Sequence, residues 1–178
     1  MSTPPSGPLP ASDRPAAPTL AAEHAGLLSE LRALLPALGQ IDPRDPRGAE
    51  RKLEALAPAR GLRSQRIEVL ARAGVRDGWL VPKSAGPKVR FGRLAKDLGG
   101  YSVDFVLMEG AAAGHTHVNG EINLGFAWSG TPRFDGHPPG WVVFAPGSQH
   151  VPTVTGGEML LVYFLPGGAV VWDTGPKK

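Results

Sequence analysis

The segments His115-Thr116-His117-Val118-Asn119-Gly120-Glu121 and Pro146-Gly147-Ser148-Gln149-His150 decide the fold of this chain. They contain three of its five histidines, and residues typical of β-strands flank both of them. Side chains two apart on a strand point to the same face, so both imidazoles of a His-x-His pair can reach one point in space. Imidazole nitrogens and carboxylate oxygens are ligands of divalent transition metals. The spacing therefore predicts one metal ion bound by His115, His117, Glu121 and His150.

The loop between His117 and Glu121 sets a geometric condition on this site. A two-residue hairpin turn at Asn119-Gly120 would pair Val118 with Glu121, and Glu121 would then face away from His117. A shared metal instead requires a three-residue loop over residues 118–120, with His117 opposite Glu121. We therefore expect Gly120 to adopt the left-handed backbone conformation, which glycine tolerates at little steric cost.

Length and composition limit the class of protein. The 178 residues are enough for one domain with a hydrophobic core, and the hydrophobic fraction of 42% is ordinary for a globular protein. The net charge is +3 and the basic residues are scattered, so we expect no nucleic-acid partner. The absence of cysteine excludes disulfides, thiolate metal sites and cysteine nucleophiles. No apolar run resembles a signal peptide or a membrane helix, so we expect a soluble cytoplasmic protein without a membrane partner.

The N-terminal part of the chain is predicted to be a tail followed by three helices. Residues 1–18 hold six of the nineteen prolines and are predicted to be disordered, because they cannot bury enough apolar surface to offset the entropy of ordering. Residues 19–78 form a predicted helical segment that packs on the rest of the protein. Its leucines recur at helical spacing up to about Leu38, Pro46 marks the start of a second helix, and Ser64 is the expected N-cap of a third.

From residue 79 to residue 175 the sequence changes to short β-rich runs separated by Gly, Pro, Asn and Asp. Evenly spaced short strands with turn residues between them are typical of a sandwich or a barrel. We therefore predict a mainly β protein, in which the helical segment precedes a small antiparallel β-barrel. The predicted strands are Val89–Ala95, Tyr101–Met108, Glu121–Trp128, Trp141–Ala145, Glu158–Leu165 and Ala169–Asp173.

The predicted strand Glu121–Trp128 has two different faces. Glu121 shares one face with small and polar residues, whereas Ile122, Leu124, Phe126 and Trp128 share the other. If Glu121 points into a metal cavity, the large apolar face points out of the barrel and must be covered. The N-terminal helices and a second subunit are the candidates for this cover. We expect both, and therefore a homodimer.

Residues 110–130 and 140–150 resemble the two motifs of the cupin superfamily. The first segment has a glycine, the His-x-His pair, Glu121 and a second glycine, and the second has Gly140, Pro146-Gly147 and His150. The glycine spacing of the first motif departs slightly from the usual pattern, outside the ligand positions. The resemblance implies a cupin-like double-stranded β-helix (jelly-roll) barrel, in which three histidines and one glutamate hold Fe, Mn, Zn or Ni.

A longer part of the chain, from about Trp79 to Gly168, resembles the 4-hydroxylaminobenzoate lyase family. The most specific run covers residues 146–157, and residues 89–93, 99–104, 114–121 and 132–136 contribute as well. The resemblance implies conversion of 4-hydroxylaminobenzoate to 3,4-dihydroxybenzoate with release of ammonia, in the breakdown of nitroaromatic acids. The alternatives are a cupin dioxygenase or isomerase acting on another small aromatic or carboxylate substrate, and a non-catalytic ligand-binding cupin.

A small aromatic carboxylate substrate needs a cation that binds its carboxylate. Arg90, Arg93 and Arg133 are the candidate anchors, because a guanidinium matches a carboxylate with two parallel hydrogen bonds. Arg90 and Arg93 cannot both point into the barrel, since an odd spacing on a strand places side chains on opposite faces.

The same substrate needs an apolar slot for its ring and groups for proton transfer. Phe105 is the expected substrate-binding aromatic residue, and Trp128, Phe144 and Tyr163 are further candidates for the slot. Glu121, Tyr163 and Asp104 are the candidate catalytic residues for proton transfer.

Overall fold

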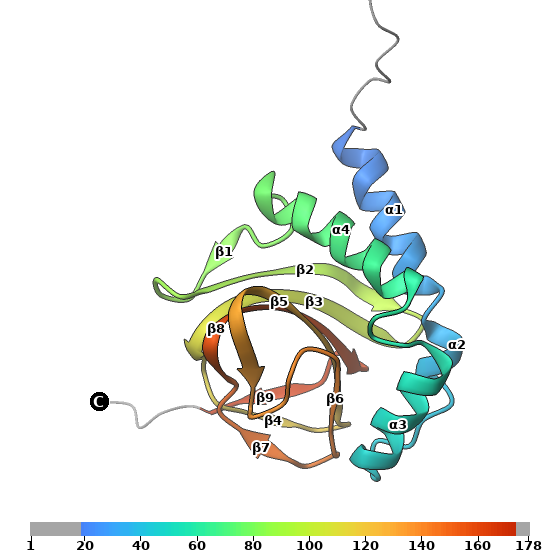
Figure 1. Ribbon diagram of the computed structural model, residues 1–178. Helices are drawn as coiled ribbons and strands as arrows, with labels where there is room; N and C mark the ends of the chain where they lie inside the picture. Colours follow the sequence, from blue (N-terminus) through green and yellow to red (C-terminus); the bar gives the residue numbers. More distant parts are fainter. Residues whose placement is uncertain (1–18, 174–178) are drawn as a thin grey trace, which may run out of the picture.

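The strands form two antiparallel sheets (Figure 1). The computed structural model describes residues 19–173, so the predicted disordered tail over residues 1–18 lies outside the described residues. The larger sheet has six strands, in the order β1 (Lys83–Ser84), β2 (Val89–Leu98), β3 (Tyr101–Ala111), β8 (Thr153–Pro166), β5 (Glu121–Phe134) and β6 (Trp141–Phe144). The smaller sheet has three strands, in the order β7 (Gln149–His150), β4 (His115–His117) and β9 (Val170–Trp172).

The two sheets curve around a shared interior (Figure 1). Apolar side chains of the larger sheet fill this interior, and Val170 of β9 packs against them from the smaller sheet. Two facing antiparallel sheets form the jelly-roll architecture to which the cupins belong. The predicted fold class, a mainly β cupin-like barrel preceded by N-terminal helices, is therefore confirmed.

Within the part of the chain that the structure describes, four helices precede the barrel: α1 (Leu20–Arg32), α2 (Leu35–Leu38), α3 (Pro46–Leu56) and α4 (Leu62–Arg76). The start of α3 is as predicted, with Pro46 in the first turn. The structure adds a cap that was not predicted, because the Asp45 side chain accepts a hydrogen bond from the Gly48 amide. The predicted N-cap Ser64 is wrong: Gly61 is the N-cap of α4, and the Ser64 hydroxyl donates a hydrogen bond to the Pro58 carbonyl. None of the helices within residues 19–173 has the length and apolar character needed to cross a membrane.

The helix predicted to run up to Leu38 is interrupted after Arg32. Pro36 explains the break, because a proline inside a helix lacks the amide donor and its ring clashes with the carbonyl four residues earlier. That carbonyl belongs to Arg32, the last residue of α1. The chain resumes as the short helix α2 in a new direction (Figure 1).

The six-stranded sheet separates two hydrophobic cores, and strand β8 contributes to both. Leu160, Val162 and Phe164 of β8 belong to the core between the sheet and the helices. Met159, Leu161, Tyr163 and Leu165, on the other face of the same strand, belong to the core inside the barrel. This is why the sequence of β8 is apolar without alternation.

The helices cover the outward apolar face of β5. Ile122, Leu124 and Phe126 are at most 5% exposed, and they pack in the same core as leucines of α1, α2 and α3. The edge strand β6 is also bound by α3, because the Glu50 carboxylate accepts a hydrogen bond from the Val143 amide at 3.0 Å. The helices therefore bury these three side chains of the face that suggested a second subunit and leave Trp128 partly buried, and the homodimer stays a prediction.

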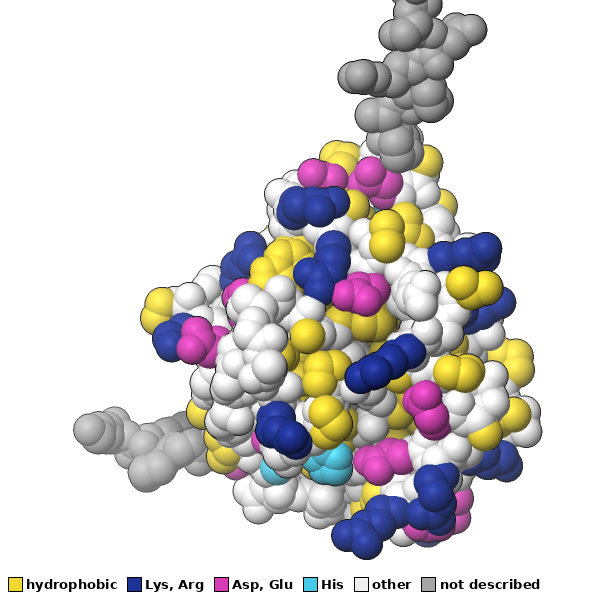
Figure 2. All heavy atoms as spheres, in the orientation of Figure 1, with side chains coloured by type: hydrophobic (Ala, Val, Ile, Leu, Met, Phe, Trp, Pro, Cys, Tyr) yellow, Lys and Arg dark blue, Asp and Glu magenta, His cyan; other side chains and the backbone are white. Residues whose placement is uncertain are grey.

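The surface carries charges of both signs. Figure 2 shows lysine and arginine side chains spread over the visible face, with acidic side chains between them, rather than gathered into one basic stripe.

Candidate metal centre

The four residues predicted as ligands come together where the two sheets meet. His115 and His117 lie on β4 and His150 ends β7 in the smaller sheet, whereas Glu121 begins β5 in the larger sheet. One ligand atom from each of the four side chains lies within 4.8 Å of the ligand atoms of the others. This group could therefore hold a single metal ion.

The loop that joins the two sheets has the predicted glycine conformation but a different pairing. Gly120 has a φ of 86°, and a Cβ atom added there would lie 2.9 Å from the Phe144 carbonyl oxygen. The predicted pairing of His117 opposite Glu121 is wrong, because β4 does not pair with β5 and His117 faces Val170 of β9. The three-residue loop instead crosses from one sheet to the other, and it still leaves His117 Nδ1 3.1 Å from Glu121 Oε2.

The cluster is buried, and several of its polar atoms have no protein partner. His117 and Glu121 are fully buried and His115 is 5% exposed. Among residues 19–173, no hydrogen-bond partner is found for His117 Nδ1 and Nε2, Glu121 Oε2 and His150 Nε2. Buried polar atoms are almost always satisfied, because an unpaired one costs about 1–3 kcal/mol. A cation between these lone pairs would satisfy them, so the residues present fit a metal ion.

Three of the four side chains are held by a second contact that leaves a ligand atom free. The Nδ1 atom of His115 lies 3.1 Å from the Ala113 carbonyl oxygen, which leaves Nε2 free. The Asn123 amide donates a hydrogen bond to Glu121 Oε1 at 2.7 Å, which leaves Oε2 free. The Nδ1 atom of His150 lies 2.5 Å from Asp135 Oδ2, which again leaves Nε2 free. Partners of this kind orient metal ligands in proteins.

The pKa values of the two β4 histidines shift in opposite directions. Burial, together with the neighbouring imidazoles of His115 and His150, lowers the pKa of His117 to about 3. His117 is therefore neutral at neutral pH, the form that binds metals. Burial also lowers the pKa of His115, but contact with Glu121, the Ala113 carbonyl and nearby negative charges outweigh it, and the net pKa is raised.

Aromatic rings surround the cluster inside the barrel. Phe144 lies 4.3 Å from His150 and 5.6 Å from His117 between ring centroids. Phe134 lies 6.0 Å from Phe144 and 6.2 Å from Tyr163. These rings form an apolar wall beside the histidines, suited to the edge or face of another aromatic ring.

A row of polar side chains crosses the barrel-facing side of the larger sheet. Cross-strand pairing places Arg93 beside Asp104, Asp104 beside Tyr163, and Tyr163 beside Asn123. Arg93 donates two hydrogen bonds to the Asp104 carboxylate, at 2.8 and 3.1 Å. Burial, followed by the charges of Glu121 and other carboxylates, raises the pKa of Tyr163 well above its usual value. Tyr163 therefore stays protonated and can act as a donor.

Comparison with known proteins agrees with the resemblance seen in the sequence. Residues 42–172, more than half of the chain, match the model of the 4-hydroxylaminobenzoate lyase family, PnbB. The chain belongs to this lyase family. It is 32% identical over 126 residues to the 4-hydroxylaminobenzoate lyase of Nocardioides sp. (strain LMS-CY), covering 63% of this chain and 73% of that protein. It is 30% identical over 131 residues to the 4-hydroxylaminobenzoate lyase of Pseudomonas putida, covering 61% and 73%.

A solved structure also has the same fold. The crystal structure of DMSP lyase DddQ from Ruegeria pomeroyi DSS-3 matches with a TM-score of 0.51, over 88% of this chain and 98% of that chain. The two sequences are 18% identical, so this likeness shows the fold alone. Membership of the 4-hydroxylaminobenzoate lyase family therefore makes the chain an enzyme of a lyase family, and the fold places its buried histidine cluster inside the barrel.

Not all of the predicted substrate-binding residues lie on the same side of the sheet as the histidine cluster. Phe105 is fully buried on the opposite face of β3, in the core between sheet and helices, so it cannot line the barrel. Arg90 pairs with Leu107 of that same outward face and is exposed. Arg133 is also exposed, and its guanidinium donates a hydrogen bond to the Gly136 carbonyl. Of the three predicted arginine anchors, Arg93 alone lies on the barrel-facing side.

Sequence reasoning missed two residues that contact the cluster. Asn123 lies two residues after Glu121 and so shares its face, which was a signal that could have assigned it a role. Asp135 lies in a Gly- and Pro-rich loop fifteen residues before His150, and nothing in that spacing predicts their contact. His137, in the same loop, is exposed.

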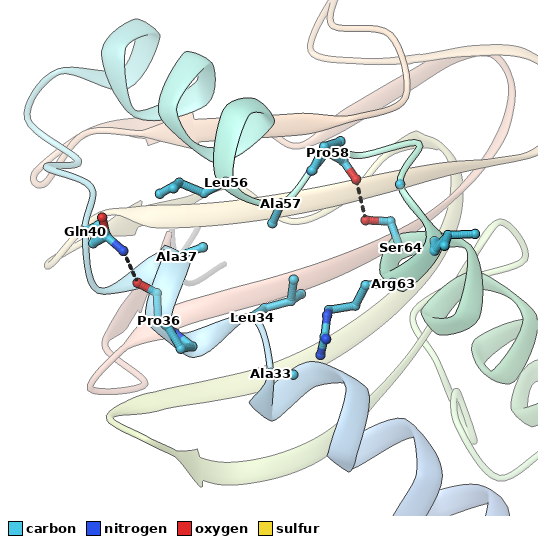
Figure 3. A pocket seen from close by; sticks show the side chains of 12 residues that line it. Ala33, Leu34, Pro36, Ala37, Gln40, Leu56, Ala57, Pro58, Arg63 and Ser64 are labelled. Atoms are coloured by element: carbon cyan, nitrogen blue, oxygen red, sulfur yellow. Dashed lines mark hydrogen bonds between the residues drawn. The ribbon is translucent and has the colours of Figure 1, made fainter.

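A separate hollow lies among the helices rather than in the barrel (Figure 3). It has a volume of about 320 Å³ and is lined by residues between Ala33 and Ser64. Arg63 is the one charged side chain in its lining, which contains no histidine or carboxylate. This hollow therefore lacks the groups for metal or acid–base chemistry.

Proposed function

We propose that this protein is a metal-dependent lyase that converts 4-hydroxylaminobenzoate to 3,4-dihydroxybenzoate with release of ammonia. The observation that carries the proposal is the convergence of four ligand atoms within 4.8 Å of one another in a member of the 4-hydroxylaminobenzoate lyase family. In three of the four side chains, His117, Glu121 and His150, the ligand atom is buried and has no hydrogen-bond partner within residues 19–173. The aromatic wall beside these atoms suits the ring of such a substrate, and Arg93, on the same side of the sheet, suits its carboxylate.

In this proposal His115, His117, Glu121 and His150 hold one divalent transition metal ion. When bound, such an ion supplies Lewis-acid stabilisation of an oxygen atom and lowers the pKa of a water molecule. Three imidazoles and one carboxylate suit Fe, Mn, Zn and Ni alike, so the donor set does not select among them. Both nitrogens of His117 are available, whereas His115 and His150 each offer Nε2.

The overall reaction consumes one water molecule and releases one ammonia molecule, so it needs no external oxidant. The N–O bond breaks, and the hydroxyl oxygen leaves with a proton as water. A second water molecule adds to the ring carbon beside the nitrogen-bearing carbon, and the resulting imine is hydrolysed to ammonia and the second phenolic oxygen. The protein must therefore protonate a leaving oxygen, hold the ring, and take protons from water.

Tyr163 is the proposed donor to the leaving oxygen. It stays protonated because its pKa is raised, and its ring packs against Phe134 in the aromatic wall. Asp104 is held by Arg93 and by the Ser102 hydroxyl at 3.4 Å, so we assign it mainly to orienting Arg93. Glu121 combines its role as a ligand with that of a candidate proton acceptor through Oε2.

Arg93 is the proposed anchor for the substrate carboxylate. Its bonds to Asp104 use Nε and Nη2, so part of its set of five N–H donors remains for a second carboxylate. The side chain of Arg93 is 50% exposed, so a ligand can reach it.

Replacing Arg93 by alanine is expected to raise KM about ten- to hundred-fold, because a charge-assisted hydrogen bond contributes about 1.5–3 kcal/mol. Arg90→Ala is the matched control, since Arg90 lies three residues away on the other face of β2, and its KM should equal that of the wild type. KM is measured in steady-state assays of product formation. Equal effects of the two substitutions on KM would show that Arg93 does not bind the substrate carboxylate.

Replacing Tyr163 by phenylalanine removes one hydroxyl from the barrel and keeps the ring. We expect kcat to fall about 100-fold or more, as is typical for loss of a general acid, with little change in KM or in thermal stability. A variant with unchanged kcat would show that Tyr163 serves only as part of the wall.

The test of the function itself is a quantitative assay on the metal-loaded protein. With 4-hydroxylaminobenzoate as substrate, we expect ammonia and 3,4-dihydroxybenzoate in equal amounts, with no consumption of oxygen. Oxygen uptake in proportion to turnover would favour a dioxygenase instead. Binding of the substrate without any product would favour a non-catalytic ligand-binding protein.

A further inference from the structure

The loop between β5 and β6 carries a carboxylate that contacts the metal centre from outside the ligand set. Asp135 and Gly136 occupy the centre of a two-residue turn, closed by two hydrogen bonds between the backbones of Phe134 and His137, each 2.8 Å long. Their φ angles are 47° and 84°, the positive values that a type I′ turn requires. Asp is one of the few residues other than glycine that tolerates this conformation. The turn therefore fixes the position of the Asp135 side chain.

Three contacts join Asp135 to the segment that carries His150. Its Oδ2 atom lies 2.5 Å from His150 Nδ1, and its Oδ1 atom accepts a hydrogen bond from the Thr153 amide at 2.8 Å. Its own amide donates a hydrogen bond to the Thr153 carbonyl, also at 2.8 Å. Both carboxylate oxygens are thus used, and the side chain is only 18% exposed. The carboxylate cannot turn away from His150 without losing the contact with Thr153.

The contact decides which nitrogen of His150 carries the proton. A carboxylate has no proton to donate, so Nδ1 must be the donor and Nε2 must keep its lone pair. That Nε2 atom is buried, has no hydrogen-bond partner within residues 19–173, and faces the other histidines, with the His150 ring centroid 4.8 Å from that of His117. Among the second contacts to the proposed ligands, Asp135 supplies the one charged group; His115 and Glu121 are held by a carbonyl and an amide.

We propose that Asp135 is a positioning residue, which holds His150 in the tautomer and orientation that direct Nε2 to a metal ion. This inference rests on the metal site of the proposed function. Asp135 does not touch the substrate or the ion, and it acts through His150. Carboxylate partners of this kind change metal affinity about 10–100-fold when they are removed.

Asp135→Asn separates positioning from a structural role in the turn. Asparagine favours the same backbone conformation, and its oxygen can still accept from the Thr153 amide. Its NH₂ group then faces His150 Nδ1, so the imidazole must place its proton on Nε2 to accept that hydrogen bond. The variant is therefore expected to keep the fold and to lose affinity for the ion.

The matched control is Asp45→Asn. Asp45 also accepts a hydrogen bond from a backbone amide, that of Gly48, but it lies at the start of α3 and contacts no histidine. Asparagine is as good an N-cap as aspartate. This variant should bind metal like the wild type.

The experiment titrates the three proteins with Co²⁺, follows the visible absorption of the bound ion, and measures affinity by competition with a chelator. We expect the wild type and Asp45→Asn to bind equally, and Asp135→Asn to bind about 10–100-fold more weakly with an altered spectrum. Equal affinity and an identical spectrum for Asp135→Asn would overturn the inference and leave the metal site intact. Absence of Co²⁺ binding by the wild type would instead contradict the proposed function.

A second measurement needs no variant, should Asp135→Asn fold poorly. The histidine ¹H–¹⁵N spectrum of the metal-free wild type, recorded in mildly alkaline solution, reports the tautomer of each neutral imidazole. We expect His150 to carry its proton on Nδ1. A proton on Nε2 would refute the assignment of Asp135, independently of the Co²⁺ titration.

Discussion

Replacing His117 by alanine is expected to abolish metal binding and to lower turnover about 1000-fold or more. The reason is that a bound ion stabilises the transition state by several kcal/mol. Within residues 19–173, both ring nitrogens of His117 lack a hydrogen-bond partner, and its side chain is fully buried. Water therefore cannot easily take the place of its imidazole at the proposed site. Elemental analysis of the purified variant and the ammonia assay measure the two effects.

His137→Ala is the matched control for this experiment. It removes another imidazole, but one that is exposed in the loop between β5 and β6. Metal content and turnover should match those of the wild type. A fully active His117→Ala variant, or one that retains stoichiometric metal, would contradict the proposed site.

Replacing Phe105 by alanine is expected to destabilise the protein by about 3–5 kcal/mol, the usual cost of emptying a buried phenylalanine position. Phe105 is fully buried against Val162 of β8 and Gly92 of β2, on the side of the sheet that the helices cover. Urea unfolding, followed by circular dichroism, measures the loss. This effect is large against the 5–15 kcal/mol that typically separates folded from unfolded chains.

Phe105→Leu distinguishes a core residue from a substrate contact. It keeps most of the buried volume and should cost less than about 1.5 kcal/mol. Since the side chain points away from the barrel, KM should stay at the wild-type value. A raised KM in a variant of nearly normal stability would show that Phe105 contributes to substrate binding.

The convergence of the four side chains could be predicted because it depends on local geometry. Alternation along a strand places His115 and His117 on one face whatever the sheet that contains them, and the glycine at Gly120 permits the tight crossing to Glu121. The pairing of those strands depends on distant segments. Strand β9 pairs with β4, and its Val170 lies opposite His117, more than fifty positions later in the chain. A hairpin would have placed Glu121 in that position.

The face of each barrel strand was harder to predict, since both faces of the central strands are buried. In β3, Phe105 and Leu107 belong to the outer core, whereas Met108 belongs to the inner one. Apolar residues on both faces carry no signal of which face is which. The position of Asp135 beside His150 likewise depends on how the loop folds back over β8, a contact between segments eighteen residues apart at Thr153.

Helix boundaries followed local rules where those rules did not compete. Pro46 starts α3 as predicted, and Pro36 ends α1. At α4 two signals competed. Gly61 follows the Pro58 turn and takes the N-cap position, and Ser64 uses its hydroxyl to bind the Pro58 carbonyl instead.

If four side chains from two sheets bind one ion, X-ray absorption spectroscopy of the Zn²⁺-loaded protein will detect their donor atoms around it. We expect one ion per chain, with several imidazole ligands and a carboxylate oxygen at about 2.0–2.2 Å. Failure to retain one equivalent of metal, or a bound ion whose spectrum lacks imidazole scattering, would contradict this expectation.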